Sequence, residues 1–150
     1  MSQATSETYE TDFYAWANEQ AALLRAGNLN AADLENIAEE IESMGRSEKR
    51  ELVNRLIVLL THLLKWQYQP NYQCSSWQTT IWSQRRELAR HLKDNPSLRA
   101  KANDILLDVY PDVPIKASLE TGFKETAFPQ SCPWSFSQIM DEGFWPGTDA

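Results

Sequence analysis

The residues of this chain that could do chemistry are a few charged side chains on otherwise apolar helices. Glu35, Glu39 and Glu42 recur on one stripe of a predicted helix, within about 60° of each other at 100° per residue. Such a stripe is typical of a solvated acidic face, but it also suits ion pairs with basic helices or a divalent ion. The Glu-x-x-His pairing of di-metal helix bundles is absent from the sequence. We therefore assign no metal ligands and leave any cofactor unknown.

Two further ionisable residues fall on or beside apolar helix faces. His62 lies at the edge of an apolar arc, where a histidine is typically half-buried with its nitrogens satisfied. Arg85 falls within the apolar arc of its helix, and an unpaired buried charge is too costly, so its guanidinium must find carboxylates or carbonyls. We predict that Arg85 forms an ion pair with an acid of another helix, the candidates being Glu39, Glu42 and Glu120.

These residues define a candidate polar cluster, which consists of Glu39, Glu42, His62, Arg85 and Glu120. It is either a structural clamp in the core or a site for a small anion or a divalent metal. None of the familiar catalytic motifs is present, and only five glycines occur, which excludes glycine-rich nucleotide loops. Whether the chain is an enzyme stays open at this stage.

Charge is distributed unevenly along the chain. Residues 1–45 carry one arginine against nine acids, residues 46–101 carry eleven basic side chains against four acids, and residues 102–150 carry two lysines against eight acids. The basic block contains a candidate basic face on the outer side of one helix, made of Arg86, Arg90 and Lys93. This face is either neutralised by the acidic helices or meets phosphate or an acidic protein. The net charge of −7 and the lack of a nucleic-acid motif weigh against nucleic acid.

Several features favour a cytoplasmic protein. The richest apolar run, 56–64, is interrupted by Thr61 and His62 and is too short to span a membrane. The polar, acidic stretch 1–12 is not a secretory signal. Cys74 and Cys132 belong to no CxxC pair, as expected for reduced cysteines, and the sequence does not show whether they meet.

Helical periodicity positions these side chains. Residues 47–67 have an apolar arc wider than half the helix, which predicts a central core helix. Glycines at 27 and 45 are predicted to end the two helices before it. The expected fold is an all-α, compact single domain over residues 1–150, a bundle of about six to seven helices with a long central third helix and an irregular C-terminal segment. The predicted helices are 12–25, 30–44, 47–67, 76–93, 96–110, 114–123 and a short one opened by a capping box of Ser135 and Gln138.

Motifs along nearly the whole chain resemble those of the family called domain of unknown function twenty-nine, uncharacterised bacterial proteins frequent in cyanobacteria. The motifs are residues 12–16 with Gln20 and 24–25, 39–45, 62–66 with 69–70, 76–77 with 80–81, 84–85, 96–98, 120–121, 128–129 and 132–133. The resemblance implies an all-helical fold and supplies no activity or catalytic residues. It implies signature positions that include Glu39, Glu40, His62, Gln69, Trp77, Arg85 and Glu120.

Our leading hypothesis from the sequence is a cytoplasmic helical protein-interaction module without catalysis. A protein partner or self-association into a homo-oligomer is expected, and membrane insertion is not. The first alternative is a metal or small-anion site, with or without enzymatic activity, between the second, third and fourth predicted helices. The second is weak nucleic-acid contact through the basic face.

Overall fold

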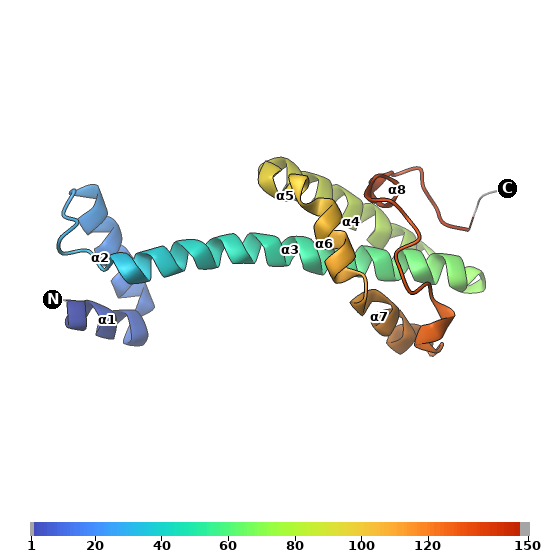
Figure 1. Ribbon diagram of the computed structural model, residues 1–150, viewed down its shortest axis with the longest axis horizontal. Helices are drawn as coiled ribbons and strands as arrows, with labels where there is room; N and C mark the ends of the chain where they lie inside the picture. Colours follow the sequence, from blue (N-terminus) through green and yellow to red (C-terminus); the bar gives the residue numbers. More distant parts are fainter. Residues whose placement is uncertain (1, 148–150) are drawn as a thin grey trace. The chain divides into compact units, whose positions relative to one another are not determined.

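The computed structural model describes residues 2–147 and shows an all-α protein. These residues are 76% helical and contain no strand, which confirms the predicted fold class. The outermost residues of the expected domain, 1 and 148–150, lie outside the described part. The elements, drawn in Figure 1, are α1 (Ser2–Thr11), α2 (Phe13–Arg25), α3 (Leu34–Tyr68), η1 (Pro70–Tyr72), α4 (Ser75–Asp94), α5 (Pro96–Ala100), α6 (Ala102–Val109), α7 (Asp112–Thr121), η2 (Glu125–Ala127) and α8 (Phe136–Met140).

Contacts divide the chain into two compact units, residues 1–48 and 49–150, which are described separately. The first unit contains α1, α2 and the beginning of α3. Asp12 caps α2, because its carboxylate accepts a hydrogen bond from the Ala15 amide. Gly27, at a φ of 74°, supplies the left-handed conformation that ends this helical segment, as predicted. Helix α1 was not predicted, because its polar sequence has no apolar periodicity.

Helix α3 runs without a break through the position where the sequence predicted a stop. Gly45 is helical, with no positive φ, so the predicted helices 30–44 and 47–67 are one helix, and the prediction of a stop at Gly45 is wrong. A glycine within a helix costs only about 1 kcal/mol relative to alanine. The helix-forming residues on both sides of Gly45 outweigh that cost.

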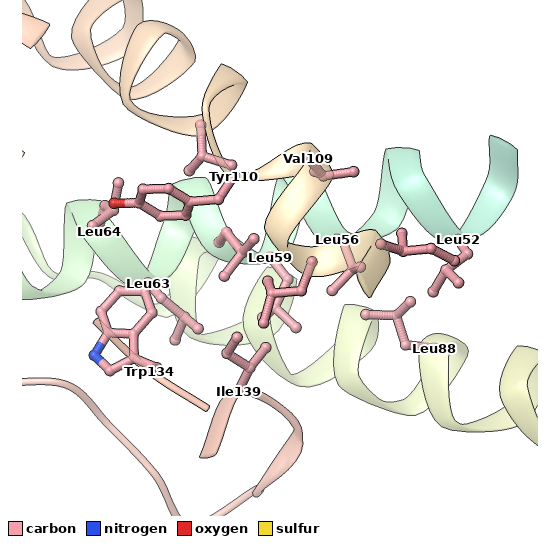
Figure 2. Packing of buried hydrophobic residues seen from close by; sticks show 14 of the residues in the cluster. Leu52, Leu56, Leu59, Leu63, Leu64, Leu88, Val109, Tyr110, Trp134 and Ile139 are labelled. Atoms are coloured by element: carbon pink, nitrogen blue, oxygen red, sulfur yellow. The ribbon is translucent and has the colours of Figure 1, made fainter. Parts of the chain in front are cut away.

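The core of the second unit is built on the C-terminal half of α3. Leu52, Leu56, Leu59, Leu63 and Leu64 are fully buried there, and Figure 2 shows them facing side chains of α4, α6 and the C-terminal segment. In Figure 1, α4 runs alongside this half of α3 and α6 crosses it. The predicted central role of this segment is confirmed.

The C-terminal part of the second unit is irregular, as predicted, and closes the core with Phe128, Trp134 and Ile139. The predicted capping box is present, with Ser135 and Gln138 bonding each other's backbone amides. The predicted helix 96–110 is instead two helices, α5 and α6, which are separated at Lys101.

Within the described residues, no helix combines the length and apolar character needed to cross a membrane.

Candidate functional site

Arg85 is buried, as predicted, but the prediction that it forms an ion pair with an acid of another helix is wrong. Its side chain is 2% exposed, and its Nε and Nη2 atoms donate hydrogen bonds to the carbonyl oxygens of Ile139 at 2.7 Å and Phe144 at 2.8 Å. The guanidinium also lies 5.5 Å from the centre of the Trp145 ring. Arg85 therefore clamps the C-terminal segment to α4 through backbone carbonyls, which carry no mark in the sequence.

The positive charge of Arg85 is offset by nearby carboxylates that do not contact it directly. Burial lowers the pKa of Arg85, and the negative charges of Asp141 and Glu142 oppose that shift. Its hydrogen bonds to the two carbonyls use two of the five guanidinium N–H donors, and the side chain is only 2% exposed. This geometry favours a structural clamp.

His62 and Glu120 lie in one neighbourhood of the second unit. The Nδ1 atom of His62 is 2.9 Å from the Val58 carbonyl, one turn earlier in α3. Burial lowers the pKa of His62, while the hydrogen bond to Val58 and the charge of Glu120 oppose the shift. Glu120 itself pairs with Lys65 at 3.0 Å, and the Lys65 ammonium lies 4.8 Å from the Trp77 ring centre. Glu120 thus joins α7 to α3 and is not the partner of Arg85.

The remaining members of the candidate polar cluster belong to the first unit. Glu39 pairs with Arg46 at 2.9 Å on the exposed side of α3, and Glu42 is exposed. Within each unit these carboxylates have ordinary surface settings. A shared site for all five residues of the cluster stays a prediction.

A second polar network joins α3 and α4, and sequence reasoning missed it. His91 is buried, and its Nδ1 atom is 2.6 Å from the Glu51 carboxylate. Arg55 lies within 4.0 Å of carboxylate oxygens of both Glu51 and Glu87 and donates to Gln84. The regular recurrence of charged residues at 51, 55, 87 and 91 was the available signal.

The three residues of the candidate basic face line one hollow of about 370 Å³, together with Ala89 and Glu142. Arg86 lies 3.7 Å from Glu142 and stacks 5.1 Å from the Trp82 ring centre, while Arg90 pairs with Glu87 at 3.1 Å. Two of the three basic residues are therefore already paired with carboxylates. This reduces the attraction that the face can exert on phosphate.

The first unit exposes much of its apolar surface. Trp16 is the one buried hydrophobic residue among its described side chains, 7–48, whereas those of the second unit, 49–147, include nineteen. Thirteen large hydrophobic side chains are exposed among the described residues of the whole chain, and seven of them belong to this smaller unit. They are Phe13, Tyr14, Leu24, Leu29, Leu34, Ile41 and Met44.

A family model described as Domain of unknown function DUF29 matches residues 8–145. The chain belongs to this family. The match covers nearly the whole chain and confirms the resemblance drawn from its motifs. No curated protein and no solved structure matches the chain.

A buried polar network holds the first unit of this DUF29 chain together. Trp16 donates its indole N–H to the Asp33 carboxylate at 3.1 Å, and Asn36 donates to the same oxygen at 2.8 Å. Gln20 is 2% exposed, and its side-chain oxygen accepts a hydrogen bond of 2.7 Å from the backbone amide of Asp33. These bonds join α2 to the beginning of α3 where few apolar side chains are buried. Trp16 and Gln20 belong to the opening family motif, but Asp33 was not singled out, although an aspartate before an apolar helix is a cap signal.

Tyr9 adds a second connection within the first unit. Its hydroxyl donates to Glu40 at 2.6 Å, and this hydrogen bond, with smaller contributions from burial and nearby carboxylates, raises the pKa of Tyr9 to about 12. Its ring packs edge-on against Trp16, with 4.7 Å between centroids. In this member of the DUF29 family, Glu40 thus fastens α1 to α3.

Proposed function

We propose that this protein is a cytoplasmic helical interaction module that works without catalysis and binds another protein through its first unit. The observation that carries the proposal is the contrast in apolar burial. Residues 7–48 bury one hydrophobic side chain and expose seven large ones, while the described residues of the second unit, 49–147, bury nineteen. Exposed apolar side chains that lie together commonly mark an interaction site, and Leu34, Ile41 and Met44 share one face of α3. Cys74 and Cys132, both free thiols, fit a reducing compartment.

The roles of the two units follow from the same contrast. The second unit has a continuous core and buried polar clamps, so it suits a scaffold. The first unit is held mainly by the Trp16, Gln20 and Asp33 network and carries its apolar side chains outward. A partner that covers them would add the burial that the unit lacks, since each covered large side chain contributes about 1.5–3 kcal/mol.

The alternatives gain less from the geometry. Arg85 is buried and donates to two carbonyls, and Glu120 pairs with Lys65, so both side chains are already engaged within the fold. The basic face is partly neutralised by Glu87 and Glu142. An enzymatic site and nucleic-acid contact therefore stay predictions from the sequence.

Site-specific photo-crosslinking in the native cell tests the proposal. A photoreactive amino acid replaces Ile41, which is 59% exposed in the first unit, or Leu119, which is 82% exposed in the second unit and serves as the matched control. We expect a discrete crosslinked product at position 41 that is absent at position 119. No product at position 41, or the same products at both positions, would overturn the assignment of the binding surface to the first unit.

A further inference from the structure

We propose that the first unit binds a cationic amphipathic helix of a partner protein along α3, with the apolar stripe formed by Leu34, Ile41 and Met44 as the contact surface. This inference rests on the proposed interaction function and adds the chemical class of the partner. Three observations carry it: the spacing of the apolar side chains, the unpaired carboxylates beside them, and the charge of the unit.

The apolar stripe has the spacing that another helix recognises. Leu34, Ile41 and Met44 are 51%, 59% and 61% exposed. Their positions, seven and three residues apart, put them within an arc of about 80° on the helix. Ile37 lies on the same side and is half-buried. Helices that dock on such a face insert their own side chains at matching spacings of three, four and seven residues.

Carboxylates beside the stripe set the charge of the partner. Glu35 and Glu42 are exposed, and neither side chain has a hydrogen bond or ion pair within the described part of the chain. They lie on one helix face, about 80–100° from Leu34 and about 160–180° from Met44, so they border only the edge of the stripe that Leu34 forms. Glu39 is by contrast paired with Arg46, and Glu40 with Tyr9. Lysines or arginines along the edge of the partner helix that lies over Leu34 would meet these two free carboxylates.

The net charge of the protein resides in this unit. Residues 1–48 carry ten acids against two arginines, a charge of −8, whereas residues 49–150 carry eleven acids against twelve basic residues. A symmetric dimer through the stripe would place like charges against each other, because both copies present the same surface. A cationic partner gains attraction instead. The charge therefore selects a basic helix over a second copy.

The test uses the full chain and a fluorescent peptide of about 18 residues, five helical turns, made of leucines and lysines in an amphipathic pattern. Fluorescence anisotropy measures its binding. We expect saturable binding that weakens by about tenfold or more in the double variant Leu34→Gln, Ile41→Gln. The variant Glu35→Gln, Glu42→Gln should weaken binding several-fold, and the loss should shrink at about 0.5 M salt, which screens charge.

Matched controls separate this inference from the proposed function. Leu107→Gln with Leu119→Gln removes two exposed leucines of the second unit and should leave peptide binding unchanged. A peptide with glutamates in place of the lysines should not bind. If it binds equally well, or if the lysine peptide fails while crosslinking at position 41 succeeds, the cationic class is wrong and the interaction surface stands.

Two other results would also overturn the inference. Binding that survives the Leu34→Gln, Ile41→Gln change would place the peptide elsewhere on the protein. A dimer in light scattering that becomes a monomer in the same variant would show that a second copy occupies the stripe. Absence of both peptide binding and crosslinking would remove the inference and the proposed function together.

Discussion

Replacement of Arg85 by methionine tests the clamp on the C-terminal segment. The change removes the donors to the Ile139 and Phe144 carbonyls, and a buried acceptor left unpaired costs about 1–3 kcal/mol. We expect Arg85→Met to lower the free energy of unfolding by about 3 kcal/mol in urea titrations followed by tryptophan fluorescence. Arg86→Met is the control, because Arg86 is exposed and pairs only at the surface. It should change stability by less than about 1 kcal/mol, and equal losses in both variants would contradict the clamp.

His62 should make the second unit sensitive to acid. Burial lowers its pKa in the folded protein, so the unfolded chain binds the proton more readily. The stability that neutral His62 supports is present above the unfolded pKa of about 6.5 and is lost as pH falls through the lower folded value. Between pH 7 and about 5, the melting temperature of the His62→Gln variant should therefore fall less than that of the natural protein. If the melting temperatures of both proteins fall equally with pH, protonation of His62 does not lower the stability of the folded protein.

At the scale of the element, Gly45→Ala tests the continuity of α3. Gly45 is helical, and an added Cβ atom would meet nothing within 4 Å. Alanine should raise the free energy of unfolding by about 0.5–1 kcal/mol. Gly27→Ala is the matched control, since Gly27 also has open space but a φ of 74°, and it should destabilise by about 1 kcal/mol or more. If Gly45→Ala destabilises as Gly27→Ala does, the helix ends at Gly45.

Most of the helices could be predicted because their apolar periodicity and caps are local. Helix α2, helix α4 and the Ser135 capping box follow from neighbouring residues. The helix end predicted at Gly45 was wrong because glycine ends a helix when its φ is positive, and the sequence does not show φ. Of the candidate polar cluster, burial of Arg85 was predictable from its position on the apolar arc, and its partner was not, because backbone carbonyls carry no residue signature.

At the scale of the whole molecule, hydrogen exchange should distinguish the two units. Among the described side chains, residues 7–48 bury one hydrophobic side chain and residues 49–147 bury nineteen, and opening free energy rises with buried apolar contact. Amides of α2 should therefore exchange faster than those of α3 between Leu52 and Leu64, as measured by mass spectrometry of peptic fragments. Equal protection in both regions would mean that they open together, and would uphold the single domain over residues 1–150 that the sequence predicts.

The uneven charge of the chain also affects how the solubility of the protein depends on salt. Mutual repulsion between copies falls off over about 8 Å at physiological ionic strength and about 3 Å at 1 M salt. The ten carboxylates of the first unit therefore keep its apolar side chains from meeting those of other molecules only while salt is low. Solubility of the isolated protein should decrease as salt rises, and concentrated stocks should keep best in dilute buffer.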